Sequence, residues 1–157
     1  SYFDKITLVG DSAHAIVPFY GQGMNAGFED ISVLNEKMNQ HGDNWEIIFE
    51  EYQRERKPNT DAIAELSYRN FVEMSSKTAD PSFLLRKKIE KKFAQKYPEL
   101  WVPLYSRVTF SDKAYSDALD IGDYQRGIMD EVMKIPGIEE TWDTEKVELK
   151  IKDLLNK

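Results

Sequence analysis

The residues best suited to chemistry lie between Gly10 and Asn25, where the sequence reads Gly-Asp-Ser-Ala-His-Ala-Ile-Val-Pro-Phe-Tyr-Gly-Gln-Gly-Met-Asn. An apolar strand pattern runs directly into an acidic side chain, Asp11. A loop with one proline and two glycines follows, and a helix pattern begins near Gly23. This order predicts a carboxylate at a strand end and free backbone N–H groups at a helix start. Both features suit a polar, partly anionic cofactor.

Each of these residues also has a structural explanation. Asp11 on its own could cap the turn that follows it, and a pair of glycines could simply begin a helix. Functionally, Gly21 and Gly23 would let the backbone approach a planar ring closely, because neither carries a Cβ atom. We interpret His14 as a structural histidine at the start of the loop. The combination of the residues is therefore more informative than any one of them.

Composition restricts the class of protein. The 157 residues carry a net charge of −7, which argues against nucleic acid as a partner. There are no cysteines and two histidines, so disulfides and thiolate metal sites are excluded and no metal site is expected. The sequence has no run of about 18 apolar residues, so no membrane span is expected. The first five residues lack the pattern of a signal peptide, so we expect a soluble, cytoplasmic protein.

The apolar periodicity predicts a mostly α fragment, with one N-terminal strand followed by about five helices. Asp43 is a plausible cap for the second helix, and Pro58 should kink or restart that helix. Asp80 and Pro81 should begin the third. Residues 101–110 are expected to be mostly an extended loop. The predicted elements are a strand at about 5–10, helices at about 23–40, 45–77, 81–96 and 112–134, and a last helix that begins at Thr141 or Asp143.

The motif resembles the second FAD-binding motif of the FAD-dependent aromatic hydroxylases, the group A flavoprotein monooxygenases. Residues 17–30, 68–74 and 102–111 are similar to the branch of that family that hydroxylates kynurenine, so the resemblance spans about residues 5–115 in order. The family's first FAD motif, G-x-G-x-x-G, lies far upstream and is absent here. Since a single strand cannot form a sheet alone, we expect a C-terminal piece of a larger α/β protein.

The resemblance implies two domains: residues 1–40 as the end of the FAD-binding domain, and residues 41–157 as a helical region that contributes to the substrate site. The residue that matches Asp11 accepts a hydrogen bond from a ribityl hydroxyl in the family, and a carboxylate suits this because it only accepts. The amides at the helix start would face the flavin N1 and C2 carbonyl. The implied cofactor-binding residues are Gly10, Asp11, Pro18, Gly21, Gln22, Gly23, Met24 and Asn25.

The resemblance also implies where the substrate binds. Phe19 and Tyr20 would lie beside its ring, and Asn70 and Tyr105 would bind its amino-acid end, since an amide and a phenol can both donate to a carboxylate. Without the family, Asn70 would be a surface polar residue on a helix and Tyr105 an interface aromatic. No side chain here is assigned a catalytic role, because the flavin carries the chemistry. Arg69 is not assigned to the family's carboxylate anchor, which belongs upstream.

The implied reaction is hydroxylation of L-kynurenine at ring position 3 with FAD, NADPH and O₂. Two alternatives stay open: a hydroxylase of the same fold with another aromatic substrate, and a non-catalytic helical interaction module. The implied partners are the small aromatic amino acid and the N-terminal part of the same enzyme, so the isolated chain should be inactive. Apolar residues exposed near the strand could also mediate dimerisation. The basic stretch Arg86-Lys87-Lys88 is interpreted as a solvated helix face.

Overall fold

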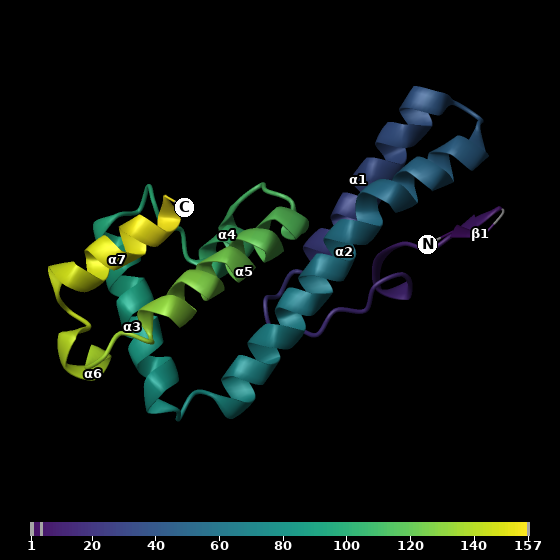
Figure 1. Ribbon diagram of the computed structural model, residues 1–157. Coiled ribbons are helices and arrows are strands. Elements are labelled where there is room, and N and C mark those ends of the chain that lie inside the picture. The colour runs from purple at the N-terminus through teal and green to yellow at the C-terminus, as the bar shows by residue number, and fades with distance from the viewer. Residues whose placement is uncertain (1, 4, 157) are drawn as a thin grey trace. The chain divides into compact units, whose positions relative to one another are not determined.

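The computed structural model describes residues 2–3 and 5–156, and the chain forms two compact units. The first unit comprises Ser1–Phe71 and Ala114–Leu119, and the second comprises Val72–Lys113 and Asp120–Lys157. The described chain is mostly helical (Figure 1), which confirms that part of the prediction. The division does not follow the boundary at residue 40, so the predicted domains remain an expectation.

The first unit begins with a short hairpin. Strands β1 (Tyr2–Phe3) and β2 (Ile6–Thr7) pair antiparallel, and a 3₁₀ turn, η1 (Gly10–Ser12), follows. The predicted strand at 5–10 was therefore too long, and the hairpin's other strand was missed. Among the described residues, no strand follows β2, so strand pairing ends at Thr7.

Two long helices dominate the first unit. Helix α1 (Gly23–His41) ends at Gly42, whose φ of 59° is the left-handed conformation that glycine adopts readily. Helix α2 (Trp45–Ser76) begins after Asn44, whose side chain accepts a 3.5 Å hydrogen bond from the Ile47 amide. Asn44, rather than the predicted Asp43, therefore occupies the capping position.

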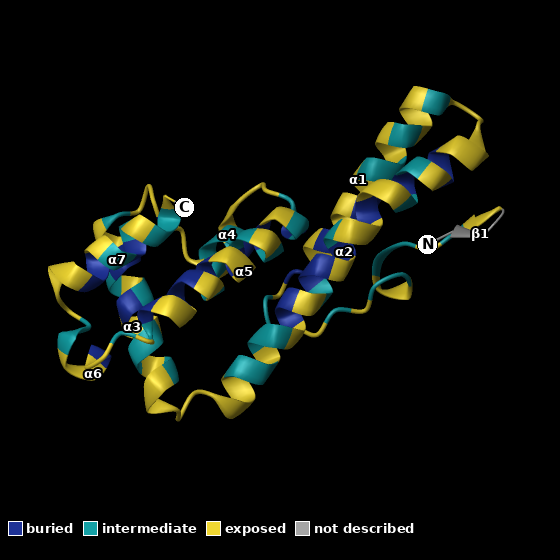
Figure 2. Ribbon diagram, in the orientation of Figure 1, coloured by how far each residue is buried: buried dark blue, intermediate teal, exposed yellow. Residues whose placement is uncertain are grey.

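Helix α2 continues through Pro58, so the helix does not restart there, and the alternative of a kink stays a prediction. Pro58 itself is exposed, while buried residues precede and follow it along one side of the helix (Figure 2). Burial of that side offsets the hydrogen bond that proline cannot donate. The buried positions of α2 are Ile48, Phe49, Tyr52, Arg56, Thr60, Ala62, Ile63, Leu66 and Ser67.

The second unit has an apolar core built from four helices and from Trp101, which lies in a loop. Helix α3 (Pro81–Lys96) starts as predicted, with the Asp80 carboxylate accepting from the Ser82 amide at 2.9 Å. Helices α5 (Tyr115–Val132), α6 (Ile138–Thr141) and α7 (Glu145–Leu155) follow. The core comprises Ile89, Phe93, Ala94, Trp101, Ile128, Met129, Val132, Ile138, Val147 and Ile151.

Three predictions for this unit were wrong in detail. Residues 104–110 form helix α4 (Leu104–Phe110) rather than an extended loop, because Pro103 precedes the first helical residue instead of interrupting the helix. Helix α5 begins at Tyr115, three residues after Asp112. The last helix begins at Glu145 after Thr144, and the separate helix α6 lies before it.

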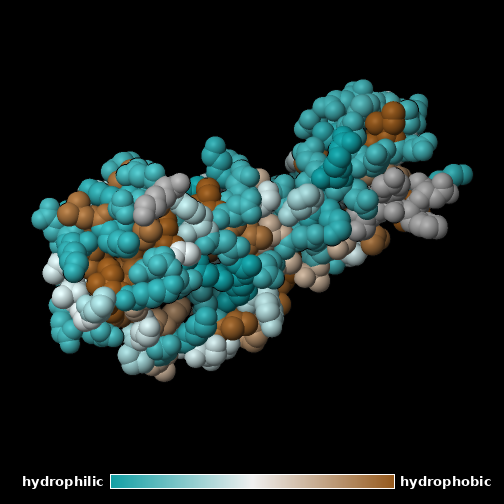
Figure 3. Space-filling model, in the orientation of Figure 1, coloured by the Kyte–Doolittle hydropathy of each residue, from teal (hydrophilic) through white to brown (hydrophobic). Residues whose placement is uncertain are grey.

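Apolar side chains also reach the surface of the first unit. Ile6 is 65% exposed and Phe28 is 63% exposed, and Leu8 and Ile31 are also exposed. The face drawn in Figure 3 likewise shows brown apolar side chains between teal polar ones. No helix of the described residues is both long and apolar enough to cross a bilayer.

Candidate cofactor site

The turn that carries Asp11 is held by its own backbone. Gly10 has a φ of 59°, and its carbonyl accepts from the amides of Ala13 at 2.8 Å and His14 at 3.0 Å. The Ser12 hydroxyl donates to the Val9 carbonyl at 2.6 Å. With the backbone folded in this way, the side chain of Asp11 is exposed at the tip of the turn. An exposed carboxylate on a fixed backbone can accept hydrogen bonds from a ligand's hydroxyl groups.

The start of α1 offers unpaired amides. The first helical hydrogen bond runs from the Ala26 amide to the Gln22 carbonyl at 2.9 Å, so the amides of residues 23–25 have no carbonyl within the helix. No side chain caps this end. Gly21 has a φ of 67°, and the space that a Cβ atom would occupy at Gly21 and at Gly23 is open. The backbone here can therefore approach a flat, electron-rich ring closely.

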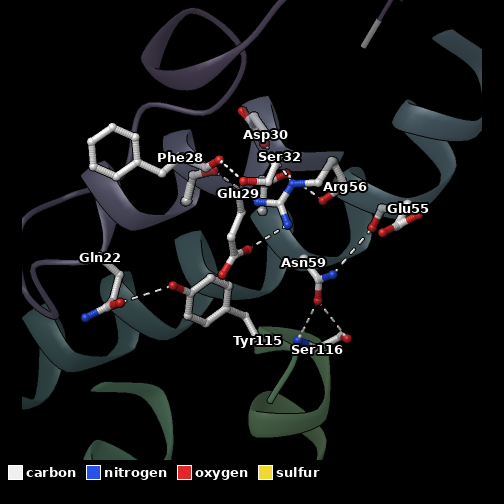
Figure 4. Close-up of polar contacts among 12 residues, drawn as sticks. Gln22, Phe28, Glu29, Asp30, Ser32, Glu55, Arg56, Asn59, Tyr115 and Ser116 are labelled. Atoms are coloured by element: carbon white, nitrogen blue, oxygen red, sulfur yellow. Dashed lines mark hydrogen bonds and ion pairs between the residues drawn. The ribbon is translucent and has the colours of Figure 1, made fainter. Parts of the chain in front are cut away.

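Gln22 lies beneath this surface and is buried. Its Oε1 accepts from the Asn25 Nδ2 at 2.8 Å and from the Tyr115 hydroxyl at 3.1 Å, and its Nε2 donates to the Tyr20 carbonyl at 3.4 Å. Figure 4 shows the bond from Tyr115. The side chain thus braces the loop, and the predicted contact of Gln22 with a cofactor stays a prediction. The other predicted cofactor residues Pro18, Met24 and Asn25 are exposed.

The loop before α1 is also tied to α2. The Asn70 Nδ2 donates to the Phe19 carbonyl at 2.8 Å, and the rings of Phe19 and Phe71 lie 4.9 Å apart. Phe19, Tyr20 and Asn70 are all half-buried. The structure therefore brings together three of the four predicted substrate-binding residues, Phe19, Tyr20 and Asn70, within the first unit.

Tyr105, the fourth, belongs to the second unit. It lies on α4, is 52% exposed, and packs edge-on against Phe110 with ring centroids 6.3 Å apart. Its predicted contact with the substrate remains a prediction.

A buried charge cluster behind the Asp11 turn was missed by the sequence reasoning. Asp30 on α1 is completely buried, and its Oδ2 accepts from the Gly10 amide at 2.8 Å. The same oxygen lies 2.5 Å from the His14 Nε2, and its Oδ1 accepts from the Arg56 Nε at 2.8 Å. A buried carboxylate with three polar partners joins the turn, α1 and α2.

Arg56 is buried as well and connects further groups. Its remaining nitrogens donate to the Glu29 carboxylate at 2.7 Å and to the Ala26 carbonyl at 3.1 Å (Figure 4). The signal in the sequence was the pair Glu29-Asp30 on an otherwise amphipathic helix, with an arginine in the next helix. The pairing could not be inferred because 26 residues separate Asp30 from Arg56.

The cluster shifts the pKa values of its members. Burial alone would raise the pKa of Asp30, but the hydrogen bonds from Arg56, the Gly10 amide and His14 outweigh it and lower that pKa. Burial opposes the charge of Arg56, yet its two carboxylate partners raise its pKa. Burial also raises the pKa of Tyr52, whose hydroxyl donates to the Leu8 carbonyl at 3.3 Å. The cluster is therefore an ionised Asp30–Arg56 pair at neutral pH.

The remaining charged groups do not suggest another site. Within the basic stretch of α3, Arg86 pairs with Glu90 and with Asp130, and Lys87 lies 3.5 Å from Glu73. Among residues 5–156, no group of three histidine, cysteine or acidic side chains is arranged to hold a metal ion.

Comparison with known proteins places this geometry in a family. Residues 2–67 match the family described as "FAD binding domain". Over all 157 residues the chain is 82% identical to kynurenine 3-monooxygenase of Christiangramia forsetii, and 67% identical to the protein of that name from Flavobacterium johnsoniae. The protein of the same name from Anopheles gambiae is 43% identical over 129 residues, which are 82% of this chain and 26% of that protein.

The chain spans about a third of the length of its bacterial relatives, 35% in each of the two above. Its similarity to them covers every residue and so extends beyond the expected limit near residue 115. The match to the FAD-binding family, residues 2–67, contains the turn, the loop and the charge cluster. The chain therefore belongs to the same family of flavoprotein hydroxylases as these kynurenine 3-monooxygenases, and corresponds to a C-terminal part of them.

Proposed function

We propose that the complete protein containing this chain is an FAD-dependent monooxygenase that hydroxylates L-kynurenine at ring position 3 with NADPH and O₂. The observation that carries the proposal is the contact between α1, whose start is open and uncapped, and the turn with the exposed Asp11 carboxylate, inside a segment that matches an FAD-binding family. The names of the relatives supply the substrate. The cytoplasmic location expected from the sequence is also proposed for this complete protein.

The residues of this chain fit the cofactor in chemistry and in shape. Asp11 would accept from a ribityl hydroxyl, and the amides of residues 23–25 would face the electron-rich edge of the flavin. The open space above Gly21 and Gly23 leaves room for the ring plane. When bound, FAD supplies the redox chemistry of the reaction. Within the complete protein, these residues would help to bind and orient the flavin and to exclude water from the site.

Substrate recognition is the second part of the proposal. One N–H of the Asn70 amide already donates to the Phe19 carbonyl, which leaves its Oδ1 and its second N–H for a ligand. Asn70 would therefore both hold the aromatic loop and bind the amino-acid end of kynurenine. Tyr105 would donate to the same end through its phenol. No side chain in this chain is assigned as an acid, a base or a nucleophile.

The proposal is tested on the purified complete gene product. Its flavin is identified by absorbance, NADPH oxidation is followed with and without L-kynurenine, and the product is analysed by mass. The expected result is bound FAD, strong stimulation by kynurenine and a product heavier by one oxygen atom. Stimulation only by other aromatic compounds would replace kynurenine by another substrate. A protein without flavin or NADPH oxidation would overturn the proposal in favour of an interaction module.

Substitutions of Asn70 and Tyr105 test the substrate assignment separately. Asn70→Ala and Tyr105→Phe should each raise the KM for kynurenine by about tenfold, which corresponds to the loss of about one hydrogen bond to a charged group. FAD content should stay unchanged in Tyr105→Phe, and Asn70→Ala is compared at saturating FAD because it also loses the hydrogen bond to the Phe19 carbonyl. Tyr68→Phe is a matched control, because Tyr68 is exposed on α2 two residues before Asn70. Unchanged KM values in both variants would remove these residues from the substrate site.

A further inference from the structure

The Asp30 carboxylate makes direct contact with the turn that carries Asp11. It accepts from the backbone amide of Gly10, the residue immediately before Asp11, and it contacts the His14 ring two residues after the turn ends. Asp30 therefore holds both ends of segment 10–14, which contains the turn. The side chain of Asp11 points outward from the segment that is held in this way.

Asp30 is itself fixed on its other side. Its second oxygen accepts from the Nε of Arg56, and that guanidinium also donates to the Ala26 carbonyl in the first part of α1. The turn and α1 are in van der Waals contact, because a Cβ atom at Gly27 would lie 3.7 Å from the Gly10 Cα. A buried, charge-assisted network of this kind has strong directional preferences and excludes water. It therefore fixes the distance between the turn and the start of α1.

We propose that Asp30 is a positioning residue for the cofactor: it holds segment 10–14 against α1, so that Asp11 and the amides of residues 23–25 face one ligand together. The inference rests on the proposed function for the identity of that ligand. Asp30 does not touch the ligand itself, because its side chain is completely buried and both of its oxygens are engaged within the unit. Arg56 and His14 act through Asp30.

The test compares two ion pairs that both join α1 to α2. Asp30→Asn removes the charge at the turn and keeps the size of the side chain. Lys37→Met is the matched control, since Lys37 Nζ lies 2.8 Å from the Glu55 carboxylate and neither residue contacts the turn in the described structure. In the complete gene product, Asp30→Asn should weaken FAD binding by about tenfold, measured by fluorescence titration, while Lys37→Met stays within about twofold.

A second readout does not depend on flavin. In the FAD-free protein, amide hydrogen exchange at residues 10–14 should accelerate in Asp30→Asn and stay unchanged in Lys37→Met. Unchanged FAD affinity and unchanged exchange in a folded Asp30→Asn protein would overturn the inference. Absence of FAD binding by the unsubstituted protein would instead overturn the proposed function, while the exchange result would still decide the role of Asp30.

If Asp30→Asn does not fold, His14→Gln provides the alternative. This substitution loosens one end of segment 10–14 and leaves the Asp30–Arg56 pair in place. It should weaken FAD binding by less than about tenfold and accelerate exchange at residues 13–14 first. Equal exchange in His14→Gln and the unsubstituted protein would contradict the positioning role.

Discussion

At the scale of single residues, the site depends on polar groups that work in pairs. Gln22 and Asp30 are both buried, and each is satisfied by partners on other segments of the first unit. A buried carboxylate without its partners would be unfavourable, because desolvation would no longer be offset. Two predictions about Asp30 and Arg56 follow from this dependence.

Arg56→Met should strongly destabilise the protein. It leaves the Asp30 carboxylate buried without its guanidinium partner, and breaking a buried pair in this way costs about 3–5 kcal/mol. Denaturant unfolding measures the change in the free energy of unfolding. Lys57→Met is the control on the next residue, since Lys57 pairs with Asp61 on the exposed side of α2 and its loss should have little effect. A change for Arg56→Met no larger than that for Lys57→Met would contradict the buried pair.

The lowered pKa of Asp30 predicts the pH dependence of stability. Because the folded state binds the proton less tightly than the unfolded state, the contribution of Asp30 is present above the unfolded pKa near 3.8 and is lost as pH falls through the lower folded pKa. The free energy of unfolding, measured from pH 7 down to pH 2, should therefore fall less steeply below about pH 4 in Asp30→Asn. Identical slopes in both proteins would contradict the lowered pKa.

At the scale of elements, local signals gave correct predictions where the chain needed no distant partner. Asp80 and Pro81 mark the start of α3 because both act within one helical turn. The predicted restart at Pro58 was wrong because the hydrogen bond that proline cannot donate is lost at one position, whereas the burial that offsets this loss is spread along α2. The contact between Tyr115 and Gln22 joins residues 93 positions apart, so no periodicity could reveal it.

Glycines in α5 give a prediction at this scale. Gly127 is exposed, and a Cβ atom added there would have no neighbouring atom within 4 Å. Gly127→Ala should therefore stabilise the helix by about 1 kcal/mol. At Gly122 the Cβ would lie 2.9 Å from the Leu104 Cδ2, so Gly122→Ala should give a smaller gain or a loss. Thermal unfolding of the two variants compares them. Equal stabilisation by both would show that α4 does not pack closely on Gly122.

At the scale of the whole molecule, the two units differ in how they are held together. The second unit has a continuous apolar core around Phe93 and Met129. The first unit contains the turn, the loop and the charge cluster, and its buried apolar side chains, such as Ile48 and Ile63, lie on α2. The residue types predicted a carboxylate before a loop and a helix start, and the structure has Asp11 exposed there, while its contact with a cofactor stays a prediction. The sequence could not predict the supporting contacts, which come from α2 and from residues 114–119.

The 157-residue chain by itself should not bind FAD measurably. Residues 2–67 match an FAD-binding family, but the chain has no G-x-G-x-x-G sequence, and it spans 35% of the length of its relative from Christiangramia forsetii. Equilibrium titration of the purified chain with FAD, beside the complete gene product, checks this expectation. Micromolar binding by the chain alone would mean that residues 10–25 and their supports suffice for the cofactor.

The most direct test of the central claim is amide hydrogen exchange of the complete gene product with and without FAD. If residues 10–25 hold the flavin, FAD should slow exchange in this segment, and adding L-kynurenine to the FAD-loaded protein should then slow exchange around Asn70 and Tyr105. Tightly bound FAD with unchanged exchange in residues 10–25 would contradict the claim and place the cofactor elsewhere.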